Sequence, residues 1–284
     1  MSDAIQAETV AQDAGGPVVA ISDPGEVGRA EHNRGDRFIV QVSNFFAWIF
    51  PILMVVIVAQ VLLRNLGRIG IGPGNQAWMD DLQWWLYGAA VLIGVAYAVT
   101  TNSHVRVDIF YDGYPERKQR WIDIFGLSWL FLPFIILCWD VTLAYALQSI
   151  ASGEGSSSPN GLHGLYFLKS FVNVAFLLVA VATWFAYLRM LAKVKKPTLW
   201  NQLVYALPSV AFAINLAIYY AALGIAMLVT DAETAREASR TWFFDEIDLP
   251  FNQEMKITVL TTLIVTAAVL AVVYLTRDKD GDAA

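Results

Sequence analysis

Two adjacent stretches decide the fold: "WWLYGAAVLIGVAYAV", residues 84–99, and "TTNSHVRVDIFYDGYPERKQRW", residues 100–121. The first is a run of sixteen uncharged, mostly apolar residues. The second places His104, Arg106 and Asp108 within five positions, each separated by a valine. An apolar run of this length that ends in charged residues predicts a membrane-spanning helix with its end at a polar surface.

The rest of the chain repeats this pattern. It has 284 residues, of which 57 % are hydrophobic and 15 % charged, whereas a soluble domain carries roughly 25 % charged residues. Short segments of alternating hydrophobicity, typical of a membrane β-barrel, do not occur. We therefore predict an all-α, polytopic membrane protein with about six transmembrane helices. The six apolar runs are Phe45–Leu66, Leu82–Val99, Ile124–Leu147, Phe171–Leu191, Leu203–Val229 and Ile257–Leu275.

The basic residues predict the orientation. Thirteen of the 19 Lys and Arg residues fall on one side: Arg29, Arg34, Arg37, Arg106, Arg117, Lys118, Arg120, Arg189, Lys193, Lys195, Lys196, Arg277 and Lys279. The six on the other side are Arg64, Arg68, Lys169, Arg236, Arg240 and Lys256. Because cytoplasmic loops carry the excess of positive charge, both termini are expected in the cytoplasm. The first apolar run is too long for a cleavable signal core and is expected to remain as a signal anchor.

Several classes of function are disfavoured. No basic stripe for nucleic acid is present, and the lone Cys138 excludes an internal disulfide and a cysteine-based metal cluster. His32 and His104 are predicted on one side and His163 on the other, so they do not form one metal site. No nucleophile and base are arranged for catalysis. We expect no enzyme, no metal and no cofactor.

The charged stretch after Val99 has two interpretations. It is a connector fixed by topology, with residues 102–111 lying in the membrane plane, Gly113 ending that segment and Pro115 opening the next helix. Alternatively, the two charge signs of Arg106 and Asp108 within one turn form a specific ion-pair dock.

A family resemblance favours the second interpretation. The segment "AWMDDLQWWLYGAAVLIGVAYAVTTNSHVRVDIFYDGYPERKQRWIDIFG", residues 77–126, resembles the small permease subunit of tripartite ATP-independent periplasmic (TRAP) transporters, the DctQ-like family. The family has an arginine at the end of helix one, here Arg64, and an acidic pair that opens helix two, here Asp80 and Asp81. The His-Val-Arg-Val-Asp run follows at His104 to Asp108, and helix three starts with a proline and basic residues at Pro115 to Arg120, followed by Asp123. A Ser/Gly/Pro loop before a Leu-Lys-Ser helix start corresponds to residues 153–171.

This resemblance implies a bacterial inner-membrane complex. Its large permease subunit would hold the substrate and ion sites for organic-anion uptake, and a periplasmic substrate-binding protein would deliver the substrate. The small subunit would be a non-catalytic scaffold in contact with membrane lipid. Its expected partner-binding residues are Arg64, Asp80 and Asp81 on the outer side, and His104, Arg106 and Asp108 on the cytoplasmic side.

Two features depart from the family pattern. Phe171 and Val172 stand where members often have Ile-Pro, and the chain continues beyond four helices. The expected organisation is a disordered cytoplasmic tail (1–37), a four-helix small-permease core (38–192), an additional transmembrane hairpin with an acidic loop (193–276) and a cytoplasmic tail (277–284). The acidic loop 231–256 is either a solvated connector or a partner contact, and it contains a possible short amphipathic helix in "DAETAREASRTWFF".

Polar residues within the spans complete the expectations. Arg64 either snorkels to the interface or pairs with Asp80 or Asp81. Asp140 is expected to be protonated, or paired with Arg64 or Lys169. As an alternative to the scaffold function, the chain would be a self-sufficient secondary transporter that uses Asp140. Three asparagines are expected to hydrogen-bond between helices: Asn44, Asn173 and Asn215. Three prolines are expected to kink their helices: Pro51, Pro133 and Pro208.

Overall fold

The computed structural model describes residues 29–104, 109–230, 235–249 and 253–277. Six of its helical segments are long and apolar enough to cross a membrane, which confirms the all-α, polytopic class. The segments are Arg34–Arg68, Ala77–Thr101, Glu116–Ser152, Leu165–Ala192, Leu207–Val229 and Ile257–Thr276. Each contains most or all of one predicted apolar run.

The elements follow one another along the chain with short connections. The N-terminal part comprises η1 (Arg29–Glu31), α2 (Arg34–Phe46), α3 (Ile49–Arg68), α4 (Ala77–Thr101), α5 (Glu116–Phe125), the π-helical segment η2 (Gly126–Phe131), α6 (Leu132–Ser152) and α7 (Leu165–Ala192). The C-terminal part comprises α8 (Leu199–Tyr205), α9 (Leu207–Val229), α10 (Ala235–Ala238), η3 (Trp242–Phe244), β1 (Glu246–Leu249), β2 (Gln253–Lys256) and α11 (Ile257–Thr276).

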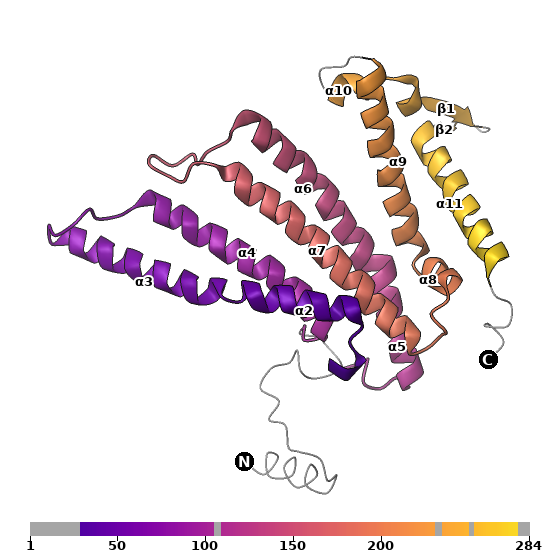
Figure 1. Ribbon diagram of the computed structural model, residues 1–284, viewed down its shortest axis with the longest axis horizontal. Coiled ribbons are helices and arrows are strands. Elements are labelled where there is room, and N and C mark those ends of the chain that lie inside the picture. Colours follow the sequence, from indigo (N-terminus) through magenta and orange to yellow (C-terminus); the bar gives the residue numbers. More distant parts are fainter. Residues whose placement is uncertain (1–28, 105–108, 231–234, 250–252, 278–284) are drawn as a thin grey trace, which may run out of the picture.

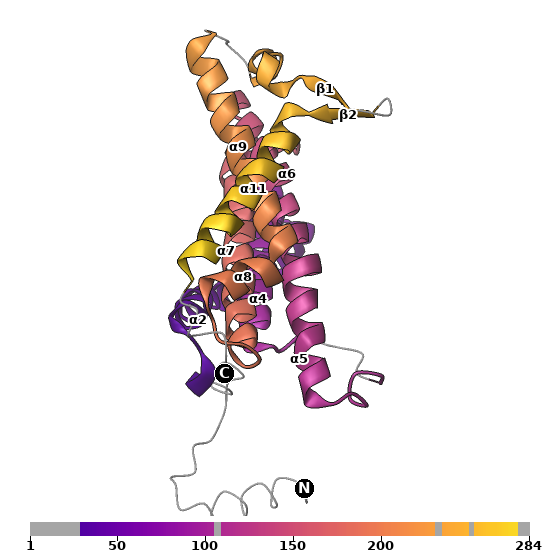
Figure 2. The ribbon, with the colours of Figure 1, turned by 90° about the vertical axis from the view of Figure 1, so that its right-hand side faces the viewer.

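The long helices fan out from one end of the molecule (Figure 1). We call it the basic end: α2 begins there, α4 and α7 end there, and α5 and α8 lie beside them. The opposite end, the loop end, carries the α3–α4 and α6–α7 connections and the β1–β2 pair. Helix α7 packs against both α4 and α6, and α9 and α11 lie beyond α6 (Figure 2).

Small and branched side chains form the core where four helices meet. Ile39 of α2, Ala96 of α4, Ile135 of α6 and Val179 of α7 are all buried in one cluster. Alanine allows close approach of helices, which is how transmembrane helices pack without a hydrophobic driving force between them. Large apolar side chains such as Val55 on α3 remain exposed, as expected of a surface that faces lipid or a partner helix.

All three prolines lie at helix breaks, as predicted. Pro51 has no N–H to donate to the carbonyl of Ala47, so α2 ends at Phe46 and α3 begins at Ile49. Pro133 is the second residue of α6, directly after the π-helical η2. Pro208 is the second residue of α9, and α8 ends three residues before it. Pro51 and Pro208 therefore each follow a division of a predicted span into two helices, whereas Pro133 follows a π-helical segment within the continuous helical run Glu116–Ser152.

The break before Pro208 joins the C-terminal hairpin to the core. The carbonyl of Tyr205 accepts hydrogen bonds from Ser128 Oγ at 3.0 Å and from Trp129 Nε1 at 2.9 Å. In return, the hydroxyl of Ser209 donates to the carbonyl of Ser128 in η2. The residues that interrupt regular helix in α8–α9 and in η2 thus meet and satisfy one another.

The N-terminal boundary differs from the expected tail of residues 1–37. Asn33 caps α2: its side chain accepts from Asp36 N, and the side chain of Asp36 accepts from Asn33 N. This reciprocal pair is a capping box, which starts the helix at Arg34. Residues 34–37 of the expected tail therefore belong to a helix, in which Asp36 is held by both this cap and a buried partner.

The acidic loop is more structured than either expectation. Its described residues form the short helix α10, the 3-10 turn η3 and an antiparallel strand pair in which Glu246 lies opposite Lys256. The alternation of Glu246, Ile247 and Asp248 suits a strand, whose side chains point to opposite faces in turn. Residues 231–234 of the possible amphipathic helix lie outside the described part.

Candidate functional site

A buried ion pair joins the first turn of α2 to the last turn of α7. Arg189 Nη1 lies 2.5 Å from Asp36 Oδ2, and the side chains are 8 % and 0 % exposed. The distance makes this an ion pair, although Nη1 does not meet hydrogen-bond geometry. A charge removed from water is tolerated when an opposite charge compensates it, and each of these supplies that for the other.

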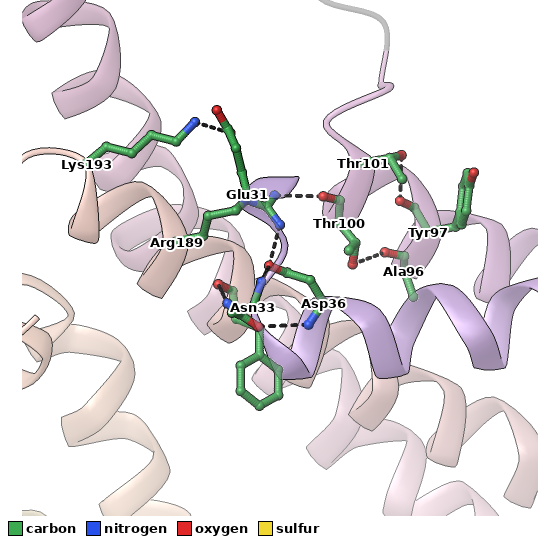
Figure 3. A network of polar contacts seen from close by, with 10 residues as sticks. Glu31, Asn33, Asp36, Ala96, Tyr97, Thr100, Thr101, Arg189 and Lys193 are labelled. Atoms are coloured by element: carbon green, nitrogen blue, oxygen red, sulfur yellow. Dashed lines mark hydrogen bonds and ion pairs between the residues drawn. The ribbon is translucent and has the colours of Figure 1, made fainter. Parts of the chain in front are cut away.

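The pair belongs to a network that spans three helices (Figure 3). Arg189 Nη2 donates to the carbonyl of Thr100 at the end of α4, at 2.7 Å. Asn33 Nδ2 donates to the carbonyl of Phe185 on α7, at 3.0 Å. We call Asn33, Asp36, Thr100 and Arg189 the clamp. It fixes α2, α4 and α7 to one another at the basic end.

Two ionisable residues border the clamp. Lys193 bonds to Glu31, and this hydrogen bond and the charge of Lys193 hold the pKa of Glu31 below its usual range. His32 is buried, and burial followed by the positive charge of Arg189 lowers the pKa of its imidazole. The region beside the clamp therefore favours a charged Glu31 and a neutral His32.

The clamp is not apparent from the sequence, where Asp36 falls in the expected tail and Arg189 serves only as a marker of orientation. One local signal was available, since Asn33 and Asp36 have the spacing of a capping box. The pairing itself joins residues far apart in the chain, and no local pattern reveals it.

The predicted outer residues lie together at the loop end. Arg64 Nη2 is 3.7 Å from Asp80 Oδ1, and the two side chains are 48 % and 42 % exposed. Arg64 also donates to Asn75 Oδ1 at 3.0 and 3.2 Å, and Gln60 donates to Asp80. Of the two expectations for Arg64, the structure therefore shows pairing with Asp80.

Asp81 serves a different contact from its neighbour. Its Oδ2 accepts from the backbone N–H of Leu162 at 2.9 Å. This bond holds the loop "SGEGSSSPNG", residues 152–161, against the start of α4. The acidic pair thus splits its contacts between Arg64 and the α6–α7 loop.

The predicted cytoplasmic anchor is only partly described. Arg106 and Asp108 lie outside the described residues, as does the whole of 105–108 within the expected in-plane segment 102–111. His104 follows the left-handed cap Asn102, which ends α4 at φ 57°. His104, Tyr111, Asp123 and Arg189 line a cavity of about 580 Å³ between α4, α5 and α7. Tyr111 donates to Asp123 Oδ2 at 2.7 Å.

The expected cationic partners of Asp140 are wrong. Lys169 Nζ pairs with Glu154 Oε2 at 2.5 Å, and Arg64 lies with Asp80. Asp140 instead accepts a hydrogen bond from the hydroxyl of Tyr220 on α9. The carboxyl group of Asp140 in α6 therefore joins the core to the C-terminal hairpin. This contact forms because the fold brings α6 and α9 together.

Two of the three asparagines make the predicted bonds between helices. Asn173 Nδ2 donates to the carbonyl of Trp139 at 2.7 Å and to Thr142 Oγ1 at 3.0 Å, which links α7 to α6. Asn215 Nδ2 donates to Thr262 Oγ1 at 3.0 Å, which links α9 to α11. Both bonds satisfy amides that would otherwise face hydrocarbon.

Comparison with known proteins gives one match. A family model described as "Tripartite ATP-independent periplasmic transporters, DctQ component" matches residues 53–196. No curated protein and no solved structure matches the chain. The matched range runs from α3 to the residues just after α7, so it includes Arg64, Asp80, Asp81, His104 and Arg189 and excludes the α8–α11 hairpin. Because the match covers just over half of the 284 residues, this multi-pass membrane protein belongs to the DctQ component family, the small permease subunits of tripartite ATP-independent periplasmic transporters.

Proposed function

We propose that this chain is the non-catalytic scaffold of a TRAP transporter in the bacterial inner membrane. It holds the large permease subunit while that subunit carries out ion-coupled uptake of an organic anion delivered by a periplasmic binding protein. The observation that carries the proposal is the family match over a helical core that is fastened at both ends. A scaffold must resist deformation, and this core has polar contacts suited to that task.

The two ends of the core are fastened differently. At the basic end the clamp buries its charges and ties three helices together. At the loop end Arg64, Asp80 and Asn75 remain half exposed, so they are accessible to another subunit. A neighbouring transport domain would therefore move against a surface that keeps its shape.

The proposed orientation places the basic end and both termini in the cytoplasm. Arg64, Asp80 and Asp81 then brace the large subunit on the outer side. His104, Arg106 and Asp108 anchor it on the cytoplasmic side. The acidic loop with β1 and β2 projects to the outer side, where it meets the large subunit or the binding protein.

The alternative, a self-sufficient transporter that uses Asp140, receives less support. The family match assigns the chain to the small subunit of a multi-component system. The carboxyl of Asp140 is occupied by Tyr220, and this contact has a structural purpose because it fastens α9 to α6.

Co-purification tests the scaffold function directly. The chain is tagged at the C-terminus, and the membrane is extracted in mild detergent to identify what co-purifies. A stoichiometric polytopic partner supports the proposal. A clean monomer or homo-oligomer that alone accumulates solute in vesicles would refute it.

A second experiment addresses the cytoplasmic anchor. Arg106→Ala combined with Asp108→Ala should lower the yield of co-purified large subunit. Lys195→Ala combined with Lys196→Ala is a control for loss of charge on the same predicted side. Normal complex yield and normal uptake in the Arg106 and Asp108 variant would reject the anchor.

A further inference from the structure

A hollow lies where α2 and α3 are interrupted beside α4. It has a volume of about 320 Å³. The interrupted helix contributes Ser43, Asn44 and Phe50 to its lining, and α4 contributes Ala90, Gly94 and Tyr97. The α2–α3 segment lies on the opposite side of the bundle from α9 and α11 (Figure 1), so the C-terminal hairpin leaves this face uncovered.

Ser43 brings an unsatisfied polar group to the hollow. The residue is 6 % exposed, and its Oγ has no hydrogen-bond partner within the described residues. An unpaired buried hydroxyl costs roughly 1–3 kcal/mol. The Oγ atom is itself closed off from solvent, so water does not replace the missing partner.

Asn44 adds a second polar group at the same place. It follows Ser43 on α2 and is exposed, so its amide faces the surroundings of the bundle. It lies about 15 Å along the helix from Arg34, at a rise of about 1.5 Å per residue. Asn44 directly precedes the apolar run that begins at Phe45, and an acyl chain offers no hydrogen bond to an amide.

Gly94 has no side chain, so α4 leaves the hollow open at this position. The residue is exposed, and a Cβ added to it would meet no atom of the described residues within 4 Å. Glycine within a helix costs about 1 kcal/mol relative to alanine, so the chain's own packing gives no reason for it. Ala90 is four residues earlier on the same face of α4. Ala90 is buried by the chain itself, so the exposed Gly94 is the point at which a second transmembrane helix can approach closely.

We propose that this hollow receives a transmembrane helix of the large permease subunit. That helix packs its backbone against the exposed Gly94 and presents a hydrogen-bonding group to the exposed amide of Asn44. A helix satisfies both requirements at once, whereas a lipid chain fills the volume and leaves the amide of Asn44 unpaired. The proposal rests on the proposed scaffold function and adds the surface through which the large subunit binds.

A glycine replacement tests the packing part. Gly94→Leu places a side chain in the hollow, and its Cβ has free space among the described residues, so the thermal stability of the isolated subunit should stay unchanged. Excess volume in a packed interface costs about 1–3 kcal/mol, so the large subunit should co-purify roughly tenfold less well. Gly224→Leu is the matched control, because Gly224 is also exposed in a spanning helix and has the same free space. Its complex yield should equal that of the wild type.

Crosslinking tests which molecule occupies the hollow. With Cys138→Ser as background the chain has no other cysteine, so Asn44→Cys provides a single reactive thiol. A photoactivatable maleimide at residue 44 should crosslink to one transmembrane helix of the large subunit, and Gly94→Leu should abolish that product.

Three outcomes would overturn the proposal. They are crosslinks only to a second copy of this chain, crosslinks only to lipid while Gly94→Leu retains the complex, and equal complex yields for Gly94→Leu and Gly224→Leu. The wild-type complex is the reference for all variants. If the wild type itself captures no large subunit, the scaffold function fails, and that result differs from failure of this interface alone.

Discussion

Arg189 Nη1 lies 2.5 Å from Asp36 Oδ2, although the two residues belong to the first and fourth spanning segments. Asp36 is in the first turn of α2 and Arg189 in the last turn of α7. Each charge therefore also has the sign that its own helix end favours, an acid at the N-terminus and a base at the C-terminus. The pair combines two local preferences with one long-range contact, which explains how both charges stay buried.

Removing one member of this pair should destabilise the fold strongly. Arg189→Gln leaves Asp36 buried opposite a neutral group, and breaking a buried pair from one side costs about 3–5 kcal/mol. We expect this loss in the free energy of unfolding, measured by denaturant titration of the subunit in mild detergent. Arg189→Gln combined with Asp36→Asn is the control, because it removes both charges and should lose less. A double variant at least as unstable as the single one would show that charge compensation is not the reason.

The sequence was sufficient to predict the six spans and their interruptions. Apolar runs of about twenty residues have one solution in a bilayer, because a helix satisfies every backbone group within itself. Pro51, Pro133 and Pro208 act locally through a missing N–H, so their breaks could be predicted without knowledge of any neighbour.

The contacts between helices could not be predicted in the same way. Asp140 was expected to be protonated or to pair with Arg64 or Lys169, and the neighbour that the fold supplies is Tyr220 of α9. Arg189 and Asp36 looked like residues of a loop and a tail, yet their helices meet at the basic end. Hydropathy determines which segments enter the membrane, but it does not determine which of these helices pack against one another. Pairing of Arg64 with Asp80 was foreseeable because only one short connection separates their helices.

The contact of Asp140 with Tyr220 should hold the C-terminal hairpin against the core. Tyr220→Phe removes the donor and should cost about 1–3 kcal/mol, the usual range for a hydrogen bond to a group of this kind. Asp140→Asn should likewise lower stability or assembly more than it alters the ion dependence of transport. A double-mutant cycle of the two substitutions isolates their coupling energy.

The adjacent tyrosine is the control for this cycle. Tyr219 packs against Tyr220 and Phe244 through its ring, so Tyr219→Phe keeps those contacts and should have little effect. Unchanged assembly together with loss of ion dependence in Asp140→Asn would contradict the structural role and support a role in ion coupling.

His32 should make stability depend on pH near neutrality. Its pKa in the folded protein lies below the ordinary value of 6.5, because burial and then the charge of Arg189 disfavour the imidazolium. The unfolded chain therefore binds more protons as the pH falls through about 6.5, which stabilises the unfolded state. The contribution of His32 is fully present above that pH and declines below it until the folded imidazole also titrates, by at most about 1.4 kcal/mol per pH unit.

Comparison of variants identifies the titrating group. His32→Gln should flatten the pH dependence of the unfolding free energy between about pH 5 and 7, a window set by the ordinary histidine pKa. Glu31→Gln is a suitable control, because the pKa of Glu31 is also lowered and its contribution disappears only below its ordinary value of 4.5. An unchanged slope in His32→Gln would assign the dependence to other groups.

The exposed pair of Arg64 and Asp80 should contribute to assembly far more than to the stability of the subunit. Half-exposed ion pairs at this distance are worth about 0–1 kcal/mol. Arg64→Ala should therefore leave the unfolding free energy of the isolated subunit within about 1 kcal/mol of wild type, while it lowers the yield of the complex with the large subunit. Arg68→Ala removes an exposed charge one turn later on α3 and should preserve that yield.

Exchanging the two charges separates a brace within the subunit from direct contact with the partner. Arg64→Asp combined with Asp80→Arg can restore the ion pair but presents each charge from the opposite position. If the pair acts by holding α3 to α4, the exchange should recover complex formation that Arg64→Asp alone loses. If Arg64 or Asp80 binds the large subunit itself, the exchange should recover the stability of the subunit and leave the complex weak. Full complex formation with Arg64→Asp alone would remove both residues from the interface.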